Sequence, residues 1–274
     1  MISRKPVRSL WVIIFCFFGL CFIMACASQG QKPVSVYVPP SENVLRVGVS
    51  PDAAPLVYKQ GEEIVGLEAE LAQELAKSLG KSVHFVELDW EDQIPALQDN
   101  RTDIIMSGMS ITTMRRYRIA FSEPYFRIGQ MPLVRKGDET EKSLFAKGVY
   151  AIIAWTPIMR IGVLKGTTGE YYVRKRLSRA KEIISFPTAN EAVSALKKGD
   201  FDLFIYDAPM IYMLAAENEA DLQVLDSLLT EEYLAWGMRK NDADLLESAN
   251  AFIEALRNDG RLDRIINRWI PFKH

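Results

Sequence analysis

The segment 107–118 combines residue types that can hold an anion. It contains hydroxyl residues, among them Thr112 and Thr113, together with Arg115, and it follows the apolar run 103–106, which predicts a buried strand. Either threonine can cap a helix that begins there. A helix N-terminus beside a guanidinium supplies N–H donors and positive potential, which together suit a carboxylate. An ordinary capped helix with a solvated arginine is the alternative interpretation.

The elements around this segment predict a parallel sheet. Residues 45–49 alternate as a strand, a helix with an apolar leucine face begins near Gly66, and residues 83–88 form the next strand. A second helix begins near Asp89 and leads to the strand at 103–106. This order implies right-handed crossovers, and such sheets bind ligands at the carboxyl ends of their strands. The loops expected to converge there are 50–54, 89–90 and 107–115.

The second half of the chain repeats this pattern. A strand at 160–164 opens it, and residues 96–107 align without gaps on residues 195–206, with helix, turn, Asp and buried strand in one register. Gly108 and Asp207 therefore stand at equivalent strand ends, and the repeat predicts two similar lobes. Taken alone, Asp207 is also compatible with a turn residue that precedes a proline.

Two extended segments are expected to connect the lobes, with crossings near 131–135 and 232–236. The apolar run 149–155 has no assigned place, because it is compatible with an added strand and with an exposed surface for a partner. The predicted boundaries are 1–25 for a leader, 26–43 for a tether, 44–133 and 232–274 for the first lobe, and 134–231 for the second.

Two motifs give the chain a family resemblance. Residues 106–115, followed by 121–126, closely resemble segments of family 3 of the bacterial extracellular solute-binding proteins, and the resemblance runs from about residue 45 to residue 272. It implies an α/β fold of the type II periplasmic-binding-protein kind. In that fold two lobes, each a mostly parallel sheet flanked by helices, hold a ligand in the cleft between them. It also implies a monomer that captures a polar amino acid for the permease of an ABC importer.

The resemblance assigns roles to particular residues. In the family, the residue matching Arg115 binds the ligand carboxylate with the fork of its guanidinium group. The residue matching Asp207 accepts a hydrogen bond from the ligand ammonium group. A free amino acid carries both charges, and burying either one without a partner would cost several kcal/mol. The expected ligand-binding residues are Ser50, Ala53, Trp90, Gly108, Ser110, Arg115, Thr167, Thr168 and Asp207.

The sequence departs from the family at one wall of the expected cleft. The family usually has an aromatic residue, stacked on the ligand, where this chain has Ala53. Either Trp90 supplies the missing wall, or the ligand is larger than is usual in the family. Tyr58, Phe121 and Tyr125 could also serve.

Two functions other than transport are also compatible with this fold. Cyclohexadienyl dehydratases resemble it and place a general acid in the cleft, and Glu87, Asp89, Glu91 and Asp92 are carboxylates near the right loops. A cluster of acids at a helix start is more often a solvated cap, and no nucleophile–base pair accompanies it, so we expect no enzymatic activity. A ligand-sensing module is the second possible function.

The N-terminus is typical of a secreted lipoprotein. Residues 1–9 are basic, and residues 10–25 form an uncharged apolar run that is short for a membrane span and suits a signal peptide. Residues 23–26 resemble the lipobox of bacterial lipoproteins. We therefore expect lipidation of Cys26 and a location in the periplasm or at the cell surface, anchored to a membrane by lipid. An uncleaved signal anchor is the alternative.

Charge and cysteine content argue against several classes of partner. The formal net charge is −2, which provides no electrostatic footprint for a nucleic acid. The three cysteines, Cys16, Cys21 and Cys26, all lie at the N-terminus, so none remains in the body of the chain for a metal site. His84 lies in a strand pattern, where a lone histidine is usually structural. We therefore expect neither a metal nor a cofactor.

Overall fold

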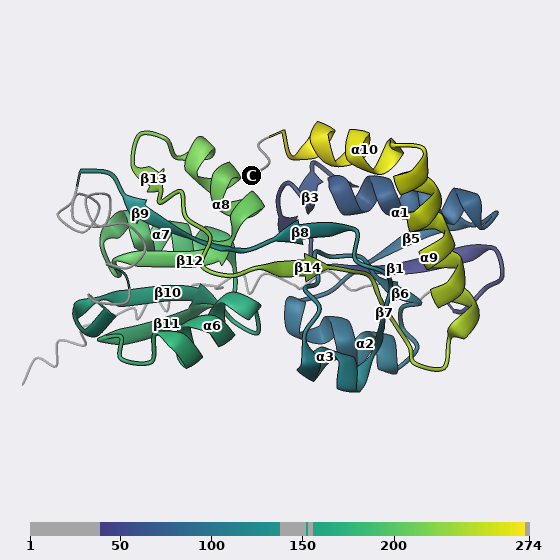
Figure 1. Cartoon of the computed structure of the whole chain (residues 1–274), viewed down its shortest axis with the longest axis horizontal. Coiled ribbons are helices and arrows are strands. Elements are labelled where there is room, and N and C mark those ends of the chain that lie inside the picture. Colours follow the sequence, from purple (N-terminus) through teal and green to yellow (C-terminus); the bar gives the residue numbers. More distant parts are fainter. Residues whose placement is uncertain (1–38, 138–151, 153–155, 272–274) are drawn as a thin grey trace, which may run out of the picture. The chain divides into compact units, whose positions relative to one another are not determined.

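The computed structural model describes residues 39–137, 152 and 156–271 of the chain. Contacts between residues place all of the described residues in one compact unit. The sheets and helices described below all belong to this unit, and Figure 1 labels those for which there is room. They confirm the predicted α/β fold.

Several predicted segments lie outside the described residues. These are the signal peptide, Cys26, and all of the apolar run 149–155 except Ile152. Ile152 is 2% exposed and belongs to a buried cluster with Val134 and Met159. Within the described part of the chain, no helix is both long enough and apolar enough to cross a membrane.

The first sheet has five strands in the order β5-β1-β6-β15-β7. β1 (Val44–Val49) pairs in parallel with β5 (Ser82–Glu87) and β6 (Ile104–Ile105). β15 (Gly237–Met238) pairs antiparallel with β6 and with β7 (Ala120–Phe121). The three parallel strands confirm the predicted strand–helix order, and the antiparallel edge makes the sheet mixed.

Helices cover both faces of this sheet (Figure 1). α1 (Leu67–Ser78) packs on β1 and β5 and contacts α9 (Ala243–Asn258) and α10 (Arg261–Trp269). α2 (Gln93–Gln98) packs on β1 and β6, and α3 (Thr113–Arg118) follows β6 along the chain. The apolar stripe of α1 is buried, as the i, i+4 spacing of its leucines predicts.

The second sheet has the strand order β11-β10-β12-β9-β13. β10 (Arg160–Leu164) pairs in parallel with β11 (Glu182–Phe186) and β12 (Leu203–Asp207). β9 (Gln130–Arg135) lies antiparallel between β12 and β13 (Leu222–Val224). The strands β11-β10-β12 therefore reproduce the order β5-β1-β6, and the two lobes share one topology.

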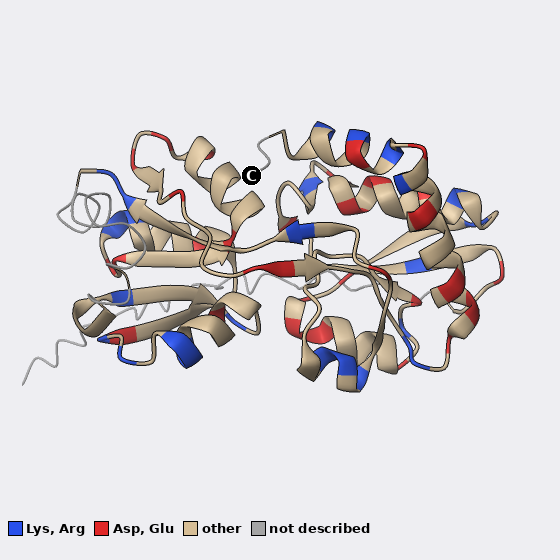
Figure 2. Cartoon of the chain, viewed as in Figure 1, with Lys and Arg blue, Asp and Glu red and all other residues tan. Residues whose placement is uncertain are grey.

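The remaining described elements are shorter or flank the second sheet. Its helices are α6 (Thr168–Arg176), α7 (Ala189–Lys198) and α8 (Ala208–Glu217). The small elements are β2 (Asp52–Ala53), β3 (Val57–Gln60), β4 (Glu63–Val65), and the 3-10 turns η1 (Trp90–Asp92) and η2 (Thr156–Ile158). Charged residues lie mainly on helices and loops (Figure 2), because strands covered on both faces are buried.

An arginine–aspartate pair recurs in both lobes and supports the predicted repeat. The backbone N–H and the guanidinium of Arg46 both donate to Asp103, with 2.7 Å between Nη2 and Oδ1. Arg160 donates to Asp202 in the same way, with 2.6 Å between the corresponding atoms. Asp103 and Asp202 are the aspartates that align in the sequence repeat. Each pair ties two parallel strands together at their amino ends, opposite the ends where ligands bind.

The strand pairing places the first connection between the lobes earlier than the sequence predicts. β8 (Phe126–Ile128) and β14 (Glu232–Leu234) form a separate two-stranded antiparallel sheet that joins the lobes (Figure 1). The first crossing is predicted near 131–135 and the lobe boundary at 133, but both fall within β9, which lies inside the second sheet. An extended apolar segment has the same pattern whether it leaves a lobe or lies buried in a sheet.

Candidate ligand-binding site

One pocket brings together the nine residues that the sequence analysis selects. They follow the carboxyl ends of β1, β5, β6, β10 and β12, where parallel sheets bind ligands. The first lobe contributes Ser50, Ala53, Trp90, Gly108, Ser110 and Arg115, and the second contributes Thr167, Thr168 and Asp207. Residues lining the pocket that were not selected are Asp52, Ser107, Leu164, Lys165, Pro187, Tyr206 and Met210.

Arg115 lies in the first turn of α3 and is held in place from several sides. Thr112, rather than Thr113, caps this helix, since its hydroxyl accepts from the Arg115 N–H at 3.1 Å. The guanidinium donates to the Ser110 carbonyl at 2.8 Å and lies 5.1 Å from the centre of the Trp90 ring. Burial lowers the pKa of Arg115, and nearby carboxylates oppose this shift. A guanidinium fixed in this way is preorganised to bind a carboxylate as a fork.

Asp207 is the last residue of β12 and is only 6% exposed. Its Oδ1 accepts a hydrogen bond from Nε2 of Gln130. Burial raises the pKa of Asp207 to about 7 and repulsion from Glu232 adds to the rise, whereas Gln130 and Arg115 oppose it. An ammonium group in the pocket would favour the charged form of this carboxylate.

The start of α6 carries the hydrogen-bond donors that the second lobe can offer to an anion. Thr167 caps the helix by accepting from the Glu170 N–H at 3.2 Å, and its hydroxyl donates to the Leu164 carbonyl at 2.7 Å. The Thr168 hydroxyl accepts from Gln130 at 3.1 Å. The hydroxyl of Thr167 is therefore used within the lobe. The backbone N–H groups of the first turn are what this helix offers to an anion.

Gly108 forms the floor of the pocket and must be glycine. Its φ is +68°, and a Cβ there would lie 2.6 Å from Cδ1 of Leu56. Its N–H donates to Oε1 of Glu68 at 2.8 Å. Because this N–H is occupied, Gly108 can offer a ligand only its carbonyl oxygen.

Glu68 supports the site from the first turn of α1, and sequence reasoning does not select it. The side chain is fully buried and accepts from Gly108, from the Tyr125 hydroxyl at 2.5 Å and from the Trp236 indole at 3.0 Å. Burial raises the pKa of Glu68 to about 7, although all three hydrogen bonds favour the charged form. Since Tyr125 precedes β8 and Trp236 follows β14, this carboxylate ties both connections between the lobes to the pocket floor.

Trp90 provides the aromatic wall that Ala53 lacks. Ala53 is 6% exposed and lines the pocket, as does Trp90, whose indole N–H donates to the Gly166 carbonyl at 3.0 Å. Tyr58 packs edge-on against Trp269 and does not line the pocket. Phe121 and Tyr125 also lie outside the pocket lining.

The two lobes touch across the pocket, and little space remains between them. The pocket holds about 40 Å³, room for a few water molecules. Besides the Trp90–Gly166 hydrogen bond, Lys165 pairs with Glu91 at 2.9 Å, and Arg115 donates to Gly166 at 3.3 Å. A solute of amino-acid size would therefore need the lobes to separate before it could enter.

The four carboxylates near the cleft loops, Glu87, Asp89, Glu91 and Asp92, do not line this pocket, so none is placed as a general acid there. Glu87 pairs with Lys59 at 2.8 Å, and Glu91 pairs with Lys165. Across the described ranges, no group of three or more His, Cys, Asp or Glu side chains is arranged to hold a metal ion.

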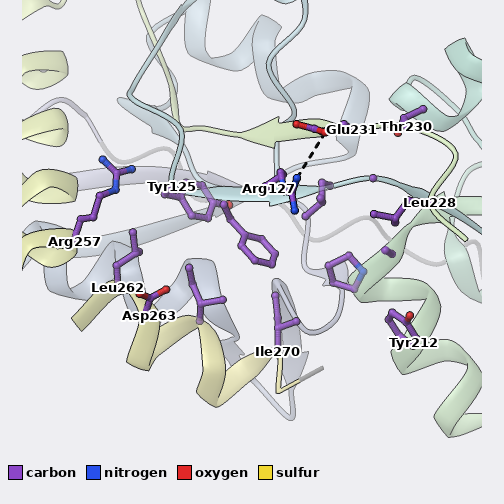
Figure 3. Close-up of a pocket in the computed structure, with 16 residues that line it drawn as sticks. Tyr125, Arg127, Tyr212, Leu228, Thr230, Glu231, Arg257, Leu262, Asp263 and Ile270 are labelled. Atoms are coloured by element: carbon purple, nitrogen blue, oxygen red, sulfur yellow. Dashed lines mark ion pairs between the residues drawn. The ribbon is translucent and has the colours of Figure 1, made fainter. Parts of the chain in front are cut away.

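A larger pocket of about 680 Å³ lies on the other face of β8 and β14, the hinge strands that join the lobes (Figure 3). Glu231 lines it and pairs with Arg127 at 3.7 Å, whereas the next residue, Glu232, contacts Gln130 beside Asp207. Successive side chains of a strand point to opposite faces, so the hinge strands separate the two pockets. None of the nine selected residues lines the larger one.

A two-lobed α/β fold with opposite charges on the two walls of one pocket defines a solute receptor of the periplasmic-binding-protein type. The chain belongs to the bacterial extracellular solute-binding proteins, family 3, whose model matches residues 45–272. The predicted family and fold are therefore confirmed.

Several relatives are similar to this protein over most of the chain. The glutamine-binding protein GlnH of an ABC transporter from Bacillus subtilis is 27% identical over 97% of both chains. A structure of a proposed ABC-transporter binding component from Wolinella succinogenes, complexed with lysine, is 33% identical, with a TM-score of 0.77, over 84% of this chain and 97% of that one. An ancestral amino-acid-binding protein, described as a precursor of cyclohexadienyl dehydratase, is 33% identical, with a TM-score of 0.74, over 84% and 96% of the two chains. All three are binding proteins, which supports solute capture rather than turnover.

Proposed function

We propose that this protein captures a free amino acid outside the cytoplasm and passes it to the permease of an ABC importer. The observation that carries the proposal is that Arg115 and Asp207 line one pocket from opposite lobes. The carboxylate of an amino acid would pair with the guanidinium and with the N–H groups at the start of α6. Its ammonium group would pair with the buried aspartate, so neither charge of the zwitterion would be buried alone.

Among amino acids, the pocket favours a cationic side chain. Asp52 also lines the pocket, and desolvation there raises its pKa, with repulsion from Asp89 adding to the rise. The lysine in the lining, Lys165, is already paired with Glu91. The pocket thus offers a second carboxylate beyond Asp207 for a ligand cation, and Trp90 offers an aromatic face for the same group. The lysine complex of the Wolinella succinogenes relative agrees with this preference.

A thermal-shift screen tests this function. The full folded chain is heated with each of the protein amino acids, with polyamines and with small carboxylates. One or a few amino acids, with lysine, arginine and histidine the leading candidates, should raise the melting temperature by about 5–10 °C at 100 times their Kd. Stabilisation by a polyamine or a carboxylate, with no amino acid active, would contradict an amino-acid receptor. Loss of uptake of the same amino acid in cells lacking the protein would distinguish transport from sensing.

We also propose that Cys26 anchors the protein to a membrane by lipid, placing it in the periplasm or at the cell surface. The support is the run at 23–26, which resembles a lipobox, and the extracellular class of the family. Cys26→Ser should leave the precursor unprocessed or release the body to the soluble fraction, as measured by intact mass and fractionation. Cys21→Ser, in the same leader, is the matched control and should leave processing unchanged. Normal processing and membrane association of Cys26→Ser would exclude the anchor.

A further inference from the structure

Gln130 and Glu232 lie behind Asp207 and bring a second carboxylate to it. Gln130 is fully buried and stands opposite Asp207 in the β9–β12 ladder. Its Nε2 is within hydrogen-bonding distance of Oδ1 of Asp207, of Oε1 of Glu232 at 3.1 Å and of the Thr168 hydroxyl at 3.1 Å. An amide nitrogen carries two hydrogens, so it cannot serve all three acceptors well.

Asp207, Gln130 and Glu232 form one group of polar side chains, and two further oxygens of this group lack a hydrogen-bond donor. Oε1 of Gln130 and Oε2 of Glu232 are buried without a hydrogen-bond partner in the described part of the chain. Exchanging the amide oxygen and nitrogen would place an oxygen against two carboxylates, so the orientation found is the better one. The group therefore contains one buried and one half-buried carboxylate, and more acceptors than donors even though the Thr230 hydroxyl donates to Oε1 of Glu232. Such an arrangement favours uptake of a proton or of an external cation.

The other titratable groups that face Asp207 do not remove this excess of hydrogen-bond acceptors and negative charge. Arg115 opposes the rise in the pKa of Asp207 through its charge, but its guanidinium donates to backbone carbonyls. Tyr125 and Tyr206 remain neutral, because burial, with Asp207 adding to it, holds their pKa well above the ordinary value. Glu232 is the other carboxylate acting on Asp207, and it adds negative charge.

We propose that Glu232, which Gln130 holds beside Asp207, is a positioning residue that makes this site exchange a proton for its ligand. The group formed by Asp207, Gln130 and Glu232 holds one proton when the pocket is empty. It releases that proton to solvent when an ammonium group binds at Asp207. The inference rests on the proposed amino-acid ligand. Glu232 acts on Asp207 through its negative charge and lies outside the pocket lining, so its role is to set the charge of Asp207 and not to contact the ligand.

The consequence is a pH-dependent affinity with a defined sign. Asp207 must be ionised to pair with an ammonium group, and burial raises its pKa to about 7. Below about pH 7, the affinity should fall about tenfold for each pH unit, because each binding event must first remove a proton. Above that pH the affinity should level off, and proton release should stop.

Isothermal titration calorimetry with lysine tests the inference, using buffers of different ionisation enthalpy between about pH 5 and pH 8.5. Native protein should release close to one proton per lysine at the acidic end. In Glu232→Gln, the pH at which binding begins to weaken should move lower, because the repulsion on Asp207 is gone. Glu231→Gln is the matched control, since Glu231 is the adjacent acid on the hinge, is exposed and faces the other pocket. It should keep the native pH profile.

Carbon-13 NMR titration of the carboxyl groups in the empty protein provides a readout that needs no ligand. Asp207 should titrate well above exposed aspartates, and its midpoint should fall in Glu232→Gln. A constant native Kd over this pH range, without proton release, would overturn the inference and leave the amino-acid function intact. If Glu232→Gln binds lysine more weakly than native protein by the same factor at every pH, the inference is also contradicted, because such a loss indicates a purely structural role for Glu232. If no amino acid binds, the proposed function fails, and the NMR titration alone decides whether the group holds a proton.

Discussion

Arg115→Ala and Asp207→Asn should each weaken amino-acid binding by about 30-fold to several-thousand-fold. Each change leaves one ligand charge buried opposite a neutral group, and truncating one member of a desolvated charge pair costs about 2–5 kcal/mol. Calorimetry at about pH 8, where Asp207 is ionised, measures the loss. Circular dichroism should show native folding, since neither side chain belongs to the apolar core.

Neighbouring charges provide matched controls for this prediction. Arg116 is exposed on the same helix as Arg115, and Asp200 is exposed in the turn before β12. Arg116→Ala and Asp200→Asn should therefore bind with native affinity. Comparable losses in these controls would mean that net charge, rather than the pocket pair, determines binding.

Ligand analogues separate the two charges. An analogue without the amino group should be penalised strongly by native protein and much less by Asp207→Asn, in which no buried charge is left unpaired. An analogue with an amidated carboxyl group should likewise bind native protein much more weakly than the parent amino acid does, and this loss should be much smaller in Arg115→Ala. If native protein binds both analogues as well as the parent, the ligand is not recognised as a zwitterion and the amino-acid assignment fails.

Glu68→Ala should lower the free energy of unfolding by about 3–5 kcal/mol. It removes the acceptor for three buried donors, on Gly108, Tyr125 and Trp236, and it leaves a cavity beneath the pocket floor. Urea unfolding measures the change. Glu70→Ala is the matched control from the same helical turn, because Glu70 contacts the exposed Arg268 and the half-buried Trp269. Its cost should be about 1 kcal/mol.

The raised pKa of Glu68 also predicts how stability varies with pH. The pKa is about 7 in the folded protein against 4.5 as its ordinary value, so the folded state binds the proton more tightly. The stabilisation from protonated Glu68 is complete below about pH 4.5 and is lost as the pH rises through about 7, a change of about 3 kcal/mol. Glu68→Gln cannot titrate, so its stability should lack this component. An identical pH dependence in both proteins would mean that Glu68 is ionised throughout.

Local sequence pattern predicts the strand ends of this site, whereas the family resemblance assigns the charged pair, Arg115 and Asp207. Apolar runs that end in Ser, Gly or Asp mark the carboxyl ends of β1, β6 and β12, and the parallel order follows from the alternation of strands and helices. Those rules are local or topological, and they therefore place Ser50, Gly108 and Asp207 at one pocket without knowledge of any long-range contact. The lobe assignment is wrong at β9, where burial in a sheet and departure from a lobe have the same pattern.

Tertiary structure alone distinguishes residues that are equivalent in sequence. Glu68 and Glu70 are both first-turn acids of α1, but only Glu68 points at the buried donors of Tyr125 and Trp236. Glu231 and Glu232 are adjacent acids on the hinge, but pairing with β8 turns one toward Arg127 and the other toward Gln130. The partners of both buried acids lie on other elements, far along the chain. Whether a carboxylate is a solvated cap or a buried acid with a raised pKa depends on those partners, and no local pattern encodes them.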